Sequence, residues 1–102
     1  MPTRVSNQEK RTLERNIFPY PVDFEMAKLG PERTKPIRLT GDGVDISSKG
    51  IGMWTTAHLT RGDVVKLYIP IPSENTILPS LSEVRWIEPG KSHNRVGLQF
   101  LA

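Results

Sequence analysis

Two arginines near the start of the chain, Arg11 and Arg15, have side chains suited to a ligand that carries phosphates and aromatic rings. A guanidinium offers five N–H donors in a planar fork, so it binds phosphate with two parallel hydrogen bonds and also stacks flat on a base. Two of them, four positions apart, therefore suit a nucleotide. Taken alone, however, this spacing is more typical of a solvated basic tail.

Asp45, Ser47 and Gly50 form a second cluster, between two apolar segments. A carboxylate can accept two hydrogen bonds from the N1 and N2 edge of a guanine, and a serine hydroxyl can donate to a phosphate or a base acceptor. Glycine lets a ligand approach the backbone, or adopts positive φ. The alternative is a β-turn stabilised by Asx and Ser side-chain hydrogen bonds, and the cluster alone favours that turn.

Residues for covalent catalysis or metal binding are scarce. The chain has no Cys, which excludes disulfides, thiol nucleophiles and thiolate zinc sites, and its only histidines are His58 and His93. These two lie far apart, without a carboxylate cluster at metal-ligand spacing, and are expected at the surface or in turns. No Ser, His and Asp arrangement indicates a triad. We therefore expect no catalytic residue, no metal and no cofactor.

Size and charge limit the possibilities further. A chain of 102 residues with 36% hydrophobic residues can bury one core but not two. The net charge of +3 favours an anionic partner, yet it is small for a protein that coats a nucleic-acid backbone. No apolar run approaches the roughly 20 residues of a membrane span, and the first residues lack the apolar stretch of a signal peptide. The expected location is the cytoplasm.

Six short strands are expected to position the two clusters. Residues 1–16 are polar without apolar periodicity and are typical of a tail, whereas apolar and polar residues alternate with the period of a strand from Tyr20 onward. The expected strands cover residues 20–29, 37–46, 51–55, 63–72, 76–88 and 95–101. With no convincing helix, this pattern predicts a small antiparallel barrel or sandwich.

Two details of these strands bear on the site. The sequence GDG at 41–43 indicates either a bulge or bend within its strand or a hairpin turn that divides it. Near the end of the fifth strand, Ser82, Val84 and Trp86 alternate with polar residues, which puts all three on one face. Trp54 and Trp86 therefore belong to the core or its rim more readily than to a stacking platform, although Trp54 is close enough to the second cluster to act beside a ligand.

In this order and at this separation, the two clusters resemble the signature of the PilZ domain family of bacterial receptors for cyclic di-GMP. That signature is RxxxR before the barrel and [D/N]xSxxG on it, and both are complete here, as Arg11 with Arg15 and as Asp45, Ser47 and Gly50. The segments PYPVDFEM, GIGMWT, VRW and RVGLQF also look like the layout of the family. The resemblance therefore covers nearly the whole chain from Glu9 onward.

The resemblance implies an all-β fold, a six-stranded antiparallel β-barrel formed by residues 17–102 and preceded by a flexible basic arm of residues 1–16. It further implies that the domain binds cyclic di-GMP and catalyses no reaction. Ligand binding would change the position of the arm and so signal to an unidentified effector protein. No membrane partner is expected.

Site residues follow from the matched motifs. Arg11 and Arg15 would close over the ligand, while Asp45 and Ser47 would meet its guanine edge and phosphates, with Gly50 completing the second motif. Lys10 directly precedes the first motif and adds a third positive charge. It would favour binding of an intercalated pair of cyclic di-GMP molecules, because a pair brings four phosphate charges instead of two.

An OB-like barrel that binds single-stranded nucleic acid is the alternative function. Against it, only 7% of the residues are aromatic, and the basic residues cluster at one end of the chain instead of along a face. A protein adaptor that has lost ligand binding is disfavoured because both motifs are intact.

Overall fold

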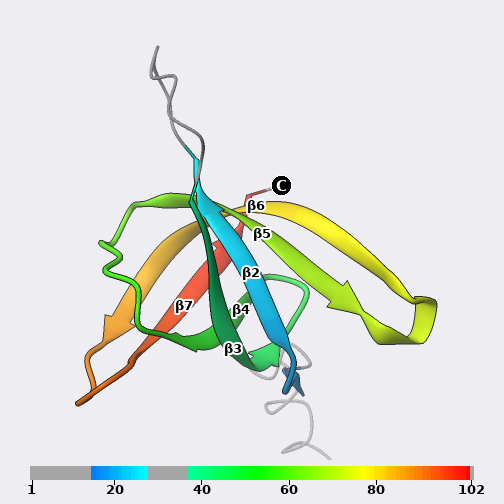
Figure 1. Cartoon of the computed structure of the whole chain (residues 1–102), viewed down its shortest axis with the longest axis horizontal. Helices are drawn as coiled ribbons and strands as arrows, with labels where there is room; N and C mark the ends of the chain where they lie inside the picture. Colours follow the sequence, from blue (N-terminus) through cyan, green and yellow to red (C-terminus); the bar gives the residue numbers. More distant parts are fainter. Residues whose placement is uncertain (1–14, 28–36, 102) are drawn as a thin grey trace, which may run out of the picture.

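The computed structural model describes residues 15–27 and 37–101, and in these ranges the chain forms a closed antiparallel barrel (Figure 1). A two-residue strand, β1 (Asn16–Ile17), precedes six barrel strands. These are β2 (Pro21–Met26), β3 (Arg38–Ile46), β4 (Gly50–Thr55), β5 (Val64–Ile71), β6 (Thr76–Glu88) and β7 (Asn94–Phe100). The only helical element in the described ranges is a 3-10 turn, η1 (Pro72–Glu74). The six-stranded antiparallel barrel is thus confirmed, whereas most of the expected arm, residues 1–14, lies outside the described residues.

The strand order explains how the barrel closes. Neighbouring strands follow the order β3-β2-β5-β6-β7-β4, and β4 pairs back onto β3. The short β1 adds to the end of β3, with Asn16 opposite Ile46 and Ile17 opposite Asp45. This pairing places residue 15 beside the second sequence cluster.

Inward-facing side chains from five of the six barrel strands and Phe18 fill the core, and Leu39 and Ile46 of β3 pack against it. The buried apolar residues are Phe18, Val22, Phe24, Ile51, Met53, Val65, Leu67, Ile69, Val84, Val96 and Leu98. They recur at every second position, so one face of each strand is removed from water and the other remains available for a site.

A bulge near the end of β3 decides between the two interpretations of GDG. The strand runs unbroken through residues 41–43, so they do not form a hairpin turn. The register of β3 against β4 shifts between Gly43 and Asp45, which leaves Val44 as the extra residue. Leu39 packs against the core before the shift and Ile46 packs against it afterwards, so the inward parity changes. Asp45 therefore lies on the outer face of the barrel.

A second bulge, in β6, makes one expectation wrong. The register of β6 against β7 shifts between Val84 and Trp86. Val84 is buried, but after the shift Ile87 packs against the core and Trp86 is 42% exposed. The indole therefore does not share the face of Val84, because the extra residue, Arg85, reverses the alternation.

Candidate ligand-binding site

An open cleft of about 180 Å³ lies on the outer surface of the barrel, over strands β4, β6 and β7. Three cationic side chains line it, from Arg15, Lys49 and Arg85, together with the indole of Trp86. Its lining in the described part of the chain includes no carboxylate. The cleft therefore suits an anion with an aromatic part.

The two sequence clusters meet at this cleft. Arg15 Nη2 donates a hydrogen bond of 2.7 Å to Asp45 Oδ1, although the two residues are 30 positions apart in the chain. Both side chains remain accessible, at 46% and 23% exposure. Pairing of β1 with β3 produces this contact. Arg11 and Lys10, the other expected cations, lie outside the described residues.

Ser47 and Gly50 shape the turn that joins β3 to β4. The Ser47 N–H donates to the Gly50 carbonyl at 2.9 Å, and the Lys49 N–H donates to Ser47 Oγ at 3.1 Å. The turn interpretation thus holds for Ser47, which is 7% exposed, but a hydroxyl that accepts one hydrogen bond keeps its proton for another acceptor. Gly50 allows β7 to approach closely, because a Cβ there would overlap the Leu98 carbonyl oxygen.

Two glycines form the floor between the carboxylate and the indole. Gly52 on β4 lies opposite Gly97 on β7, Asp45 lies opposite Gly52, and Trp86 lies opposite Gly97. A Cβ on Gly52 would stand 2.8 Å from Asp45 Oδ1, and one on Gly97 would overlap the Trp86 ring. Because neither glycine has a side chain of its own, the Asp45 carboxylate lies over Gly52 and the Trp86 ring lies over Gly97, both close to the sheet.

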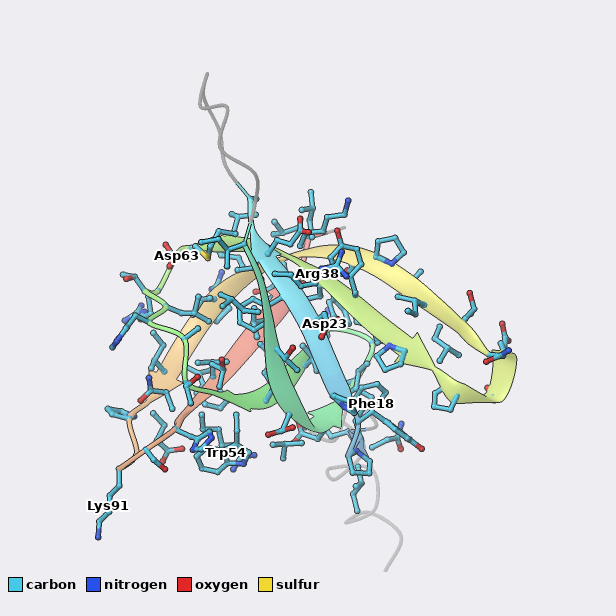
Figure 2. The ribbon with its side chains drawn as sticks, in the orientation of Figure 1. Phe18, Asp23, Arg38, Trp54, Asp63 and Lys91 are labelled. Atoms are coloured by element: carbon cyan, nitrogen blue, oxygen red, sulfur yellow. The ribbon has the colours of Figure 1, made fainter. Side chains whose placement is uncertain are left out.

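Arg95, on β7, is a second cation beside Asp45. Its Nη2 lies 3.8 Å from Asp45 Oδ2, and its guanidinium carbon lies 5.8 Å from the centroid of the Trp54 ring. The Asp45 carboxylate thus stands between two arginines. Trp54 lies outside the barrel wall, near the β6–β7 connection that carries Lys91 (Figure 2). Its ring is in reach of that connection, since a Cβ on Gly90 would be 3.9 Å from it.

Sequence reasoning missed several residues of this site: Lys49, Arg85, Trp86, Arg95 and Gln99. Lys49 stands inside the second motif, which was the one available signal. Arg85 and Trp86 could be placed only after the β6 bulge was known, and Arg95 could be placed only from the register of β7 against β4.

Metal-ligand clusters and membrane-spanning helices are absent from the described ranges. No group of His, Asp and Glu there could hold a metal ion. His58 and His93 are both exposed, as expected. No helix in this part of the chain is long and apolar enough to cross a membrane.

Comparison with known families shows which family the chain resembles over its length. The model of the family described as PilZ domain matches residues 6–102, essentially the whole chain. Among curated proteins, no sequence matches.

Proposed function

Because the chain belongs to the PilZ domain family, whose members are receptor domains for cyclic di-GMP, we propose that it binds this dinucleotide in the cleft lined by Arg15 and Trp86, with Asp45 beside it. The observation that carries the proposal is the contact of Arg15 with Asp45 beside the glycine floor. It brings the proposed phosphate-binding group, Arg15, beside the proposed base-recognising group, Asp45. The proposed role is binding, without a reaction.

The proposed base contact is made by the Asp45 carboxylate. A carboxylate has about four lone-pair sites, so Asp45 can accept the N1–H and N2–H of a guanine while Arg15 keeps its hydrogen bond. Arg15 and Arg95, one near each carboxylate oxygen, limit the rotation of the group. A carboxylate held in place loses less conformational entropy when the base binds.

Trp86 supplies the proposed stacking surface. The indole lies over Gly97 at the edge of the cleft and is 42% exposed, so one part of it rests on the sheet and another faces the cleft. Stacking of a base on an aromatic side chain contributes roughly 1–3 kcal/mol.

The phosphates are proposed to bind Arg15, Lys49 and Arg85, with Arg11 reaching them from the arm. Ordering the arm costs about 1–2 kcal/mol per residue, which the charge-assisted hydrogen bonds must offset. The position of the arm then differs between the free and bound states, and an effector protein can read that difference.

A pair of intercalated cyclic di-GMP molecules is the proposed bound form. The cations that line the cleft, with Lys10 added from the arm, are suited to the four phosphate charges of a pair. Titration at protein concentrations well above the dissociation constant should saturate near two ligands per chain, and Lys10→Ala should move the value toward one. Saturation at one ligand for the unmutated protein contradicts the pair.

Isothermal titration calorimetry with cyclic di-GMP tests the function itself, with GMP and cyclic AMP as controls. Cyclic di-GMP should bind much more tightly than either, because only it presents two phosphates and two guanine edges. A folded protein that shows no heat and no spectral shift at several hundred micromolar cyclic di-GMP would falsify the proposal.

A further inference from the structure

The outer part of the β5–β6 hairpin extends beyond the barrel (Figure 1). Pairing of β2 with β5 ends at Tyr68, and pairing of β7 with β6 begins at Ser82. Between these two points, β5 and β6 pair only with each other. We call residues 70–81 the hairpin tip.

The hairpin tip is apolar and nearly uncharged. Ile77, Leu78 and Leu81 are 60%, 50% and 48% exposed. Between Lys66 and Glu83 the only charged residue in the sequence is Glu74. Ile77 and Leu81 share one face of β6 and Leu78 lies on the other, so both faces of the hairpin tip present exposed apolar side chains, as contact surfaces do.

The inner face of the hairpin tip leads into an apolar groove of about 380 Å³. The side chains that form it include Phe18, Ile46, Ile69, Ile71, Leu78 and Phe100. Phe18 and Ile69 also belong to the core, and Ile46 and Phe100 pack against it. The groove is thus an opening of the core at one end of the barrel.

Prolines close both free edges of the hairpin tip to strand pairing. The Leu81 carbonyl accepts a hydrogen bond from the Leu101 N–H and so points away from β5. Every second residue of β6, including Pro79, therefore directs its backbone groups to the edge of β6 that faces away from β5. On β5 the Val64 carbonyl accepts a hydrogen bond from the Ala27 N–H and so points away from β6. By the same alternation, Pro70 faces the edge of β5 that points away from β6. Each proline lacks the N–H that an added strand would need. A partner therefore contacts the faces of the hairpin and not its edges.

We propose that the occupant of the groove is the hairpin tip of a second copy of the chain, in a twofold-symmetric dimer. Within residues 15–27 and 37–101, one molecule carries both an apolar projection and an open apolar groove, so two copies that exchange projections satisfy both and leave no free site for a third. A twofold contact also brings each charged residue near the same residue of the other copy, and like charges repel. This repulsion is small here because Glu74 is the only charged residue of the hairpin tip.

The size of the surface sets the strength of the dimer. The hairpin tip and the groove together include fewer residues than the roughly 20–30 per partner of a standard interface. The contact is therefore of the weak class that small interfaces form. The dimer should form at high protein concentration and dissociate on dilution.

Analytical ultracentrifugation of the full chain, without any nucleotide, tests this proposal separately from the proposed function. From about 1 μM to about 1 mM protein, the mass should rise from monomer to dimer and then stay constant. Leu78→Asp and Ile77→Asp should each raise the dissociation constant at least tenfold. Ile37→Asp is the matched control, because Ile37 is 73% exposed and does not line the groove, and it should dimerise normally.

Circular dichroism and thermal unfolding establish that each variant is folded, and Ile77→Asp replaces a largely exposed side chain, so at least one variant retains the barrel. A wild-type chain that remains monomeric at every concentration overturns the proposal. This is also the result expected if another segment of the same chain covers the groove. Assemblies that keep growing beyond two copies overturn the twofold contact. A dimer that neither hairpin variant weakens overturns the location.

Discussion

The Asp45 carboxylate, the proposed base-recognition group, lies beside two basic groups of the candidate site. Arg15 donates to one of its oxygens at 2.7 Å, and Arg95 lies 3.8 Å from the other. Truncation of either arginine leaves the carboxylate less constrained, whereas truncation of Asp45 removes the acceptor itself. The variants of these residues therefore have different expected effects.

We expect Asp45→Ala to bind cyclic di-GMP more weakly than Asp45→Asn, and both to bind more weakly than the unmutated protein. Asn keeps one acceptor but loses the charge, whereas Ala removes both acceptors. Calorimetric titrations with cyclic di-GMP and with cyclic di-AMP measure affinity and guanine selectivity together, and selectivity should also decrease. Equal affinities for all three proteins would mean that Asp45 has only a structural role.

Arg15→Ala should weaken binding tenfold or more with little effect on folding. A charge-assisted hydrogen bond contributes about 1.5–3 kcal/mol, and Arg15 is an exposed residue outside the core. Arg61→Ala is the matched control, since Arg61 is also exposed but does not line the cleft. If the two variants bind equally well, Arg15 does not contact the ligand. The same loss is expected for Arg11→Ala.

The two tryptophans of the chain can be distinguished by fluorescence. In Trp54→Phe, Trp86 is the only tryptophan, and saturating cyclic di-GMP should quench its emission strongly because a base stacks on the indole. In Trp86→Phe the remaining Trp54, which does not line the cleft, should respond less. A stronger response from Trp54 would place the base on the other side of Arg95.

At the scale of the elements, two bulges build the site. The bulge in β3 turns Asp45 to the outer face, and the bulge in β6 turns Trp86 to the same face. Without them, the alternation of each strand would direct both side chains into the barrel, where a carboxylate without a partner is strongly unfavourable. β4 and β7, which lie between the bulged strands, contribute the glycine floor.

Gly97→Ala should move the Trp86 indole off the floor and weaken ligand binding, while the barrel remains folded. The added methyl group would overlap the Trp86 ring. Because this ring is partly exposed, it can move away more easily than the backbone of β7. A double-mutant cycle measured by calorimetry checks this coupling. If the loss caused by Gly97→Ala is as large in the Trp86→Ala background, the glycine does not act through the indole.

At the scale of the whole molecule, the distribution of charge separates a dinucleotide receptor from a nucleic-acid-binding barrel. The net charge is only +3, and the cations of the site are gathered at one cleft. A protein that contacts 6–10 phosphates loses about 10³–10⁵ in affinity between 50 and 200 mM salt. A compact ligand with two phosphates contacts far fewer, so its affinity should respond much less.

We therefore expect the affinity for each bound cyclic di-GMP molecule, which brings two of the four phosphates of the proposed pair, to decrease by about tenfold at most over that range of salt. Fluorescence titrations at several salt concentrations measure it, with a single-stranded oligonucleotide as the comparison ligand. Tight, steeply salt-dependent binding of the oligonucleotide, without binding of cyclic di-GMP, would favour the OB-like alternative.

The sequence by itself determined the class of fold and the residue types of the site. Apolar residues at every second position, separated by turn residues, specify strands with one buried face, and six such strands without a helix predict a small antiparallel barrel. Motif spacing identified Arg15 and Asp45, which the structure brings into contact. This information is local, so it can be read along the chain.

Only the tertiary structure decided which face of the barrel carries Trp86, and which residues stand beside Asp45. An alternating pattern has the same form on either side of a bulge, and the shift of register appears only when a strand is paired with its neighbour. Arg95 reaches Asp45 across β4, a proximity set by the order of β7, β4 and β3 in the closed barrel. Such contacts depend on closure of the barrel, and sequence periodicity contains no information about it.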